Sequence, residues 1–168
     1  MGQELIHGGD WAGYAAQYGG KPLDFSANVS PLGLPDGVRD AVIRSLDGAG
    51  DYPDPLCRAL REAIAGAEDV DPDWILCGGG AADLIYRAVL AKRPRRALVT
   101  APTFAEYEAA LDLAGCETER YLLREETGCA LDGGVFTAIT PETDMVFLCQ
   151  PRTPTGRTVP RALLRSVL

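Results

Sequence analysis

The sequence predicts an α/β protein with three layers (α/β/α), in which helices cover both faces of a mainly parallel sheet. Short continuous apolar runs, typical of strands buried on both faces, occur at 74–77, 97–100 and 145–149. From residue 74 onward these runs alternate with segments whose apolar residues recur at helical spacing. Glycine or proline separates the two kinds of segment, as in strand–helix–strand units.

Length, charge and composition limit the kinds of function. A chain of 168 residues fits one domain with a sizeable core, or part of a larger one. The net charge of −8 argues against a nucleic-acid binder. No apolar run approaches the roughly 20 residues that span a bilayer, and the N-terminus lacks a secretory pattern, so we expect a cytoplasmic protein without a membrane anchor. Five scattered cysteines without a CxxC pair fit reduced thiols, and a single histidine argues against a zinc site.

Residues 1–35 are rich in glycine and proline, which predicts an extended arm with little core of its own. His7, followed by Gly8 and Gly9, fits either an N-terminal ligand grip or an ordinary surface histidine.

The next segment, residues 36–70, predicts two helices. The first spans Asp36 to Leu46 and stops at the following glycines. For the second, Asp54 is a suitable N-cap and Pro55 a suitable first residue, with the helix running to about Ala67. Tyr52, on the loop between them, either packs or directs its hydroxyl at a ligand.

The stretch from Trp74 to Lys92 predicts a strand, a glycine turn at 78–80 and a helix from Ala81. The first N–H groups of such a helix are unpaired, which makes the turn either a phosphate cradle or a tight turn with nothing bound. A dinucleotide fingerprint would need glycine in place of Asp83, and the Gly-Lys-Ser/Thr of a P-loop is absent from the sequence. The turn also lacks lysine and arginine, so any phosphate would be held by backbone amides.

Strands are further expected at 97–100, 119–124 and 145–149, with one helix ending at Gly115 and another beginning near Pro160. Phe104 follows the first of these strands, and a proline-rich loop at 150–156 follows the last. Because ligands bind outside the carboxyl ends of parallel strands, we expect Phe104 on the same rim as Gly80. Its ring either stacks on a ring-bearing ligand or packs in the core.

Six motifs together resemble the fold-type I pyridoxal-phosphate enzymes of the class I and II aminotransferase superfamily. The nearest branch is the threonine-phosphate decarboxylases of cobalamin biosynthesis, and the next is the histidinol-phosphate aminotransferases. The motifs occur in family order: HGGD at 7–10, DFSANVSPLGLP at 24–35, YPDP at 52–55, GGGAAD at 78–83, PTFAEYEAAL at 102–111 and PRTPTG at 151–156. The resemblance implies an incomplete fold-type I large domain, with an N-terminal arm at 1–35, a helical small-domain or interface segment at 36–70 and the first part of the cofactor-binding domain at 71–168.

The resemblance also implies roles for individual residues in binding pyridoxal 5'-phosphate. The cofactor phosphate would lie at Gly80, Ala81 and Ala82, and the Phe104 ring would stack on the pyridine. In a homodimer, Tyr52 would reach the cofactor phosphate of the neighbouring subunit. The substrate, a phosphorylated amino acid, would be gripped through its phosphate or carboxylate by His7, Gly8 and Asn28.

Two departures from the family pattern matter. Thr153 stands where the family has the asparagine that hydrogen-bonds the phenolic oxygen of the cofactor, and a hydroxyl is a shorter group. The chain has two lysines, Lys21 and Lys92, and neither fits the lysine that forms a Schiff base with the cofactor. In the family that lysine, its acidic partner and the carboxylate-binding arginine follow the Pro-Thr-Gly loop, so we assign no catalytic residue to this chain.

We therefore expect the N-terminal portion of a threonine-phosphate decarboxylase or a related aminotransferase, inactive by itself. The alternative is a degenerate, non-catalytic module that binds a phosphorylated small molecule or serves as an assembly partner.

Overall fold

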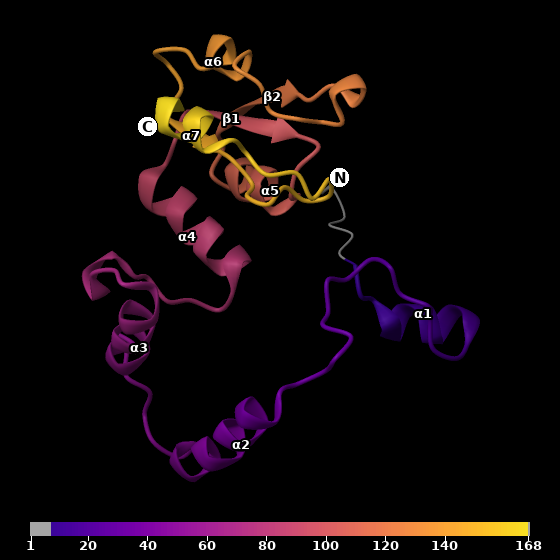
Figure 1. The fold of residues 1–168 in the computed structure, drawn as a ribbon, viewed down its shortest axis with the longest axis vertical. Helices are drawn as coiled ribbons and strands as arrows, with labels where there is room; N and C mark the ends of the chain where they lie inside the picture. The colour runs from indigo at the N-terminus through magenta and orange to yellow at the C-terminus, as the bar shows by residue number, and fades with distance from the viewer. Residues whose placement is uncertain (1–7, 168) are drawn as a thin grey trace. The chain divides into compact units, whose positions relative to one another are not determined.

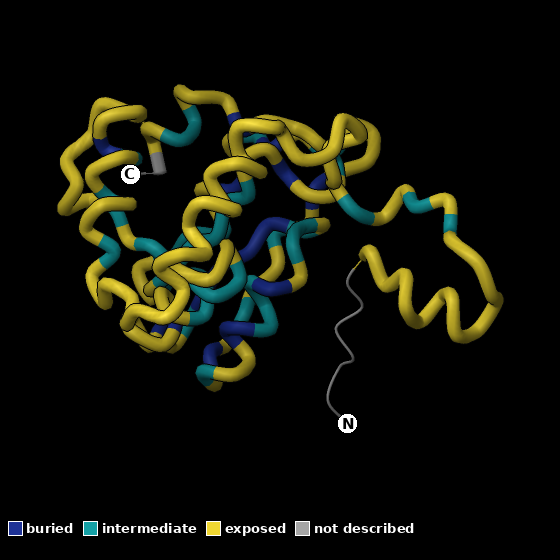
Figure 2. Tube along the Cα trace, turned by 90° about the horizontal axis from the view of Figure 1, so that it is seen from below, coloured by how far each residue is buried: buried dark blue, intermediate teal, exposed yellow. Residues whose placement is uncertain are grey.

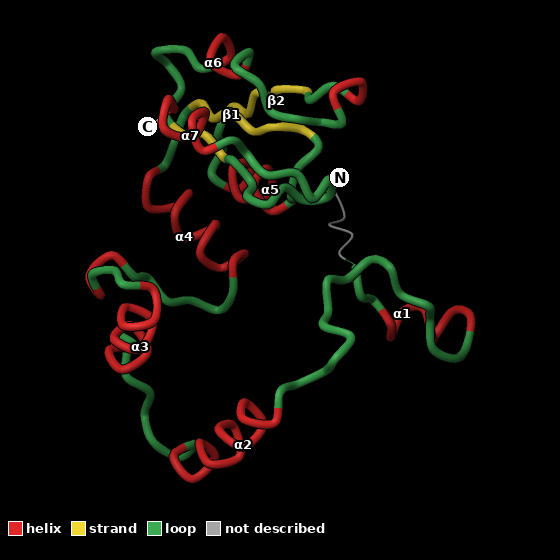
Figure 3. The backbone as a smooth tube through the Cα atoms, in the orientation of Figure 1, coloured by secondary structure: helices red, strands yellow, loops and turns green. Residues whose placement is uncertain are grey.

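The computed structural model describes residues 8–167, which form two compact units divided after Arg58 (Figure 1). Helices and loops make up the described part of the first unit, and the second contains the sheet (Figure 3). The elements of the first unit are α1 (Trp11–Tyr18), α2 (Asp36–Ser45) and a 3-10 turn (Leu46–Gly48).

The arm contains a helix that the glycine-rich sequence does not predict. The Asp10 carboxylate caps α1 by accepting the Gly13 N–H at 2.9 Å. None of residues 8–35 is buried, so the tube of Figure 2 is almost continuously yellow along this segment. Apolar packing therefore contributes little to the shape of the arm, and hydrogen bonds must define it.

The helices of residues 36–70 follow the sequence pattern with one correction. The α2 helix begins at Asp36 as predicted, but α3 spans Arg58–Glu68 and does not begin at Pro55. The Asp54 carboxylate accepts the N–H groups of both Leu56 and Arg58, and Cys57 between them has a φ of 49°. This capping turn uses the residues that would otherwise form the first helical turn.

A parallel sheet of three strands organises the second unit, which confirms the prediction of a mainly parallel sheet. The strands are β1 (Arg96–Ala101), β2 (Glu117–Leu122) and β3 (Met145–Phe147), in the order β2-β1-β3. Leu98 in the central strand is in register with Glu119 on one side and Val146 on the other.

Helices cover both faces of this sheet, as the three-layer prediction requires. Alternate residues of β1 point to opposite faces. Ala97 and Val99 pack with one buried cluster, which includes Val89 of α4 (Ala81–Lys92) and Leu111 of α5 (Glu106–Leu113). Leu98 packs with the other, whose members include Val135 of α6 (Val135–Ala138) and Leu163 of α7 (Arg161–Val167). In Figure 1, α5 and α6 lie on opposite sides of β1 and β2.

The predicted buried strand at Trp74–Cys77 is wrong. Pro72–Trp74 is a 3-10 turn, Ile75 is extended but pairs with no described strand, and Trp74 and Leu76 are 83% and 67% exposed. A strand needs a neighbour for its backbone hydrogen bonds, and the three described strands do not provide one here. Two other strands shift: 117–122 replaces 119–124, and the last ends at Phe147 with half-buried residues.

Among residues 8–167, every helix is too short or too polar to cross a bilayer.

Candidate functional site

The N-terminus of α4 presents backbone amides without partners. Gly80 precedes the helix with φ 96° and ψ 176°, a conformation that suits glycine, and no described side chain caps the helix. The first α-helical bond in this turn is donated by the Leu84 N–H to the Gly80 carbonyl. The N–H groups of Ala81 and Ala82 therefore have no acceptor within the described part of the chain, and they fit a phosphate.

Asp83 holds the glycine turn against the helix. Its carboxylate accepts the Gly79 N–H at 2.8 Å and forms an ion pair with Arg87 at 2.9 Å. These contacts, the backbone N–H first and the guanidinium second, lower the pKa of Asp83. A Cβ on Gly78 would lie 2.6 Å from the Asp83 carboxylate, so a side chain there would displace this carboxylate. The turn is thus built to leave the Ala81 and Ala82 amides free, while the Gly79 amide is already satisfied.

The start of α4 is connected to the start of α5. The hydroxyl of Tyr86, in the second turn of α4, hydrogen-bonds the buried Glu106 carboxylate at the first residue of α5. Phe104 lies two residues before Glu106, just beyond the carboxyl end of β1. The glycine turn and Phe104 therefore precede two helices that are connected to each other. Because no strand leads into Gly80, the expectation that Phe104 and Gly80 share one rim of the sheet stays a prediction.

Phe104 lies in an aromatic cluster at the carboxyl ends of β1 and β3. Its ring meets the Tyr107 ring edge-on at a centroid distance of 5.8 Å, and Tyr107 stacks on Phe147 at 4.6 Å. Phe104 is half-buried, so its ring is supported by the cluster while part of it remains accessible. This arrangement is compatible with stacking on a planar ligand.

The Cys149 sulfur links this cluster to the 150–156 loop. The Tyr107 hydroxyl hydrogen-bonds Cys149, and the same sulfur accepts the Thr153 N–H at 3.4 Å. Burial and this hydrogen bond raise the pKa of Tyr107 to about 12. The Thr153 side chain itself is exposed and free to meet a ligand.

Replacing Tyr107 with phenylalanine should remove the phenol that ionises near pH 12. Because the folded state keeps the proton after the unfolded state has released it at about pH 10, the phenol of Tyr107 lowers stability as pH rises from about 10 to about 12. We expect Tyr107→Phe to remove one tyrosinate from the absorbance change near pH 12 and to flatten this part of the stability profile. Tyr14→Phe, in the arm, is the control, and equal effects of both substitutions would contradict the assignment.

The 150–156 loop is anchored by bonds that could not be predicted from the sequence. Arg152 is 2% exposed, and its guanidinium donates to the Cys129 carbonyl at 2.5 Å. Its backbone accepts from Gly156 and donates to Arg157, and the Gln150 side chain accepts the Val159 N–H. A second arginine, Arg157, donates to the Gly128 carbonyl. These bonds fix the loop on which Thr153 lies.

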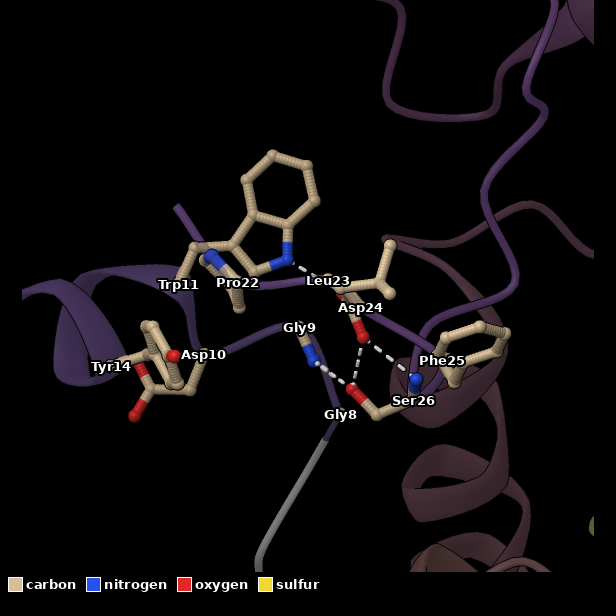
Figure 4. Close-up of a pocket in the computed structure, with 10 residues that line it drawn as sticks. All are labelled: Gly8, Gly9, Asp10, Trp11, Tyr14, Pro22, Leu23, Asp24, Phe25 and Ser26. Carbon is tan, nitrogen blue, oxygen red and sulfur yellow. Dashed lines mark hydrogen bonds between the residues drawn. The ribbon is translucent and has the colours of Figure 1, made fainter. Parts of the chain in front are cut away.

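In the first unit, Gly8 lines an open pocket of about 700 Å³ formed by residues 8–11, Tyr14 and residues 22–26 (Figure 4). Asn28 follows the second of these segments, and His7 lies outside the described residues. Tyr52 is 93% exposed. Its contact with a neighbouring subunit stays a prediction.

The two lysines lie in different units. The Lys21 ammonium, in the first unit, is 4.8 Å from the centre of the Trp11 ring in the arm. Lys92 is the last residue of α4, roughly 15 Å from the helix start at 1.5 Å per residue.

Comparison with known proteins decides the family. Residues 20–168 match the family described as Aminotransferase class I and II. The chain belongs to this family. The homologues of the chain are pyridoxal-5'-phosphate-dependent aminotransferases and decarboxylases. The family expected from the six motifs is therefore confirmed, and so is its cofactor.

Three relatives show how this family member compares. Threonine-phosphate decarboxylase of Salmonella typhimurium is 42% identical over 96% of the chain and 45% of its own length. Histidinol-phosphate aminotransferase of Leuconostoc citreum is 36% identical over 78% of the chain and 38% of its own length. The crystal structure of L-threonine-O-3-phosphate decarboxylase from Porphyromonas gingivalis has a TM-score of 0.68 at 28% identity, covering 79% of this chain and 38% of that one. The chain therefore spans less than half the length of each.

Proposed function

We propose that this chain is the N-terminal portion of a pyridoxal-phosphate-dependent threonine-phosphate decarboxylase of cobalamin biosynthesis, or of an aminotransferase that acts on a similar phosphorylated amino acid. We further propose that it works in the cytoplasm as a homodimer and is inactive by itself. The pair of unpaired amides at Ala81 and Ala82, in a chain of this family, carries the proposal.

Each residue of the site has a defined task in this proposal. The amides of Ala81 and Ala82, with Gly80 as the turn, bind the cofactor phosphate. Phe104 covers the pyridine ring, and Thr153 donates a hydrogen bond to the phenolic oxygen. Tyr52 completes the phosphate site of the neighbouring subunit. Gly8 and Asn28, together with His7, bind the substrate's phosphate or carboxylate.

When bound, pyridoxal phosphate supplies the electron sink that both reactions need. The described residues orient it and the substrate, and orientation selects which bond of the substrate breaks. The position of Lys92 supports the proposal that the chain alone has no turnover, because this lysine ends α4, roughly 15 Å from the cradle at the start of the helix.

The segment boundaries expected from the sequence belong to the same proposal: an arm at 1–35, a small-domain or interface segment at 36–70 and the first part of the cofactor domain at 71–168.

A titration of the purified chain with pyridoxal phosphate tests this function. We expect saturable binding in the absorbance spectrum, no turnover of L-threonine O-3-phosphate, and no lysine adduct after borohydride treatment and peptide mapping. Absence of binding would contradict the cofactor site and favour the alternative of a degenerate module, which Thr153 in place of asparagine also favours. A single stoichiometric adduct at Lys21 or Lys92 would show that this lysine forms the Schiff base and would contradict the proposal that the chain lacks it.

A further inference from the structure

One carboxylate, that of Asp24, joins two segments of the arm that lie far apart in the sequence. It accepts the Trp11 indole N–H at 2.5 Å, the Ser26 N–H at 2.7 Å and the Ser26 hydroxyl at 2.6 Å (Figure 4). The Ser26 hydroxyl oxygen in turn accepts the Gly9 N–H at 2.9 Å. Residues 8–11 and 24–26 are thus held together through Asp24 and Ser26.

This network places Gly8 beside the segment that leads to Asn28. A Cβ on Gly8 would lie 2.1 Å from the Ser26 carbonyl oxygen, and a Cβ on Gly9 would lie 3.4 Å from the Ala27 Cβ. The two glycines therefore lie directly against Ser26 and Ala27, the residues that precede Asn28. The absence of a side chain at Gly8 is required for this contact, whatever ligand the arm binds.

Few other interactions define the arm. None of residues 8–35 is buried, and its further side-chain contacts are local caps or ring contacts. Hydrogen-bond donors stabilise the ionised form of a carboxylate. The donors to Asp24 lower its pKa to about 2, and the Ser26 hydroxyl is the largest cause. The carboxylate is therefore ionised at neutral pH and already supplied with donors.

We propose that Asp24 is a positioning residue for substrate recognition, because it ties Gly8 to the segment of Asn28 so that the two can bind one phosphorylated amino acid together. This inference rests on the proposed function, which gives Gly8 and Asn28 their substrate roles. Asp24 itself does not touch the substrate; it acts through Ser26 and Trp11. Because Trp11 donates to Asp24, its indole fluorescence also reports whether residues 8–11 and 24–26 are held together; we call this arrangement the closed arm.

The test uses the 168-residue chain carrying Trp74→Phe, which leaves Trp11 as the one tryptophan of the two in the sequence. L-threonine O-3-phosphate is titrated while Trp11 fluorescence is followed. We expect Asp24→Asn to weaken binding roughly tenfold, because it removes the charge from a carboxylate that three donors share. Ser26→Ala should weaken binding by a smaller factor, since it breaks only the bond to Gly9 and one bond to Asp24.

Asp10→Asn is the matched control. The substitution also removes one charge, and Asp10 lines the same pocket as Asp24 and accepts a backbone N–H, but its bond to Gly13 only caps α1 and joins no second segment. Equal losses for Asp10→Asn and Asp24→Asn would overturn the positioning role, because they would show an effect of charge alone.

An acid titration of Trp11 fluorescence without ligand separates this proposal from the proposed function. Protonation of Asp24 should change the emission near pH 2, and Asp24→Asn should abolish this transition while Asp10→Asn keeps it. If the Trp74→Phe chain does not bind L-threonine O-3-phosphate, the substrate assignment of the arm fails. If the acid transition survives in Asp24→Asn, the claim that Asp24 holds the arm closed is contradicted, even where binding is observed.

Discussion

Gly80→Ala is expected to weaken pyridoxal-phosphate binding roughly tenfold or more. Gly80 has a φ of 96° with an extended ψ of 176°, where an L-residue is strained by about 1–3 kcal/mol. A Cβ there would meet nothing within 4 Å, so the cost is in the backbone and not in a clash. The turn is expected to relieve this strain by moving, which displaces the Ala81 and Ala82 amides. Absorbance titration with the cofactor measures the affinity, and urea unfolding measures the stability.

Two glycine substitutions serve as controls for Gly80→Ala. Gly79 has no positive φ, and a Cβ there would make ordinary contact with Asp83 at 3.7 Å, so Gly79→Ala should leave binding nearly unchanged. Gly115 follows α5 with φ 69° and open space around it, so Gly115→Ala should lower stability by about 1 kcal/mol without changing the cofactor affinity. If Gly115→Ala weakened cofactor binding as much as Gly80→Ala, the local role of the cradle would be refuted.

Of the substitutions considered, Leu111→Ala should cause the largest loss of stability, about 2–5 kcal/mol in the free energy of unfolding. Leu111 in α5 is fully buried in the cluster that joins α4, α5 and β1 through Val89 and Val99. Its truncation leaves a cavity at the centre of the face that supports the helix of the phosphate cradle. Urea or thermal unfolding followed by circular dichroism measures the change.

Leu113→Ala is the matched control for Leu111→Ala. It makes the same chemical change in the same helix, but the Leu113 side chain is 66% exposed. We expect its effect to stay within about 0.5 kcal/mol. A loss comparable with that of Leu111→Ala would mean that the exposed face of α5 is packed in solution.

Features that depend on neighbouring residues could be predicted from the sequence. The α4 helix begins and ends at the predicted residues because its glycine turn and apolar spacing are local signals. The central strand was predictable because burial on both faces produces a continuous apolar run, and four successive residues of β1 are indeed buried. The cofactor family followed from six short motifs in order, and the family match confirms it.

Other features of the site depend on groups that meet across long stretches of chain. Arg152 lies in a proline-rich loop whose sequence gives no sign of burial, but it is buried, and its guanidinium donates to the carbonyl of Cys129, 23 positions away. Tyr107 of α5 and Cys149, which follows β3, are likewise far apart in the sequence and meet only in the folded chain.

By itself, the sequence determined the α4 helix, the central strand, the alternation that makes a three-layer parallel fold, and the family with its cofactor. The tertiary structure decided that Trp74–Cys77 forms no strand, that Asp24 joins the two segments of the arm, and that Arg152 anchors the loop of Thr153. The physical reason is the same in each case. Helix spacing and caps are set by residues within one turn of each other, whereas a strand partner, a buried cation or a shared carboxylate depends on contacts that only the folded chain brings together.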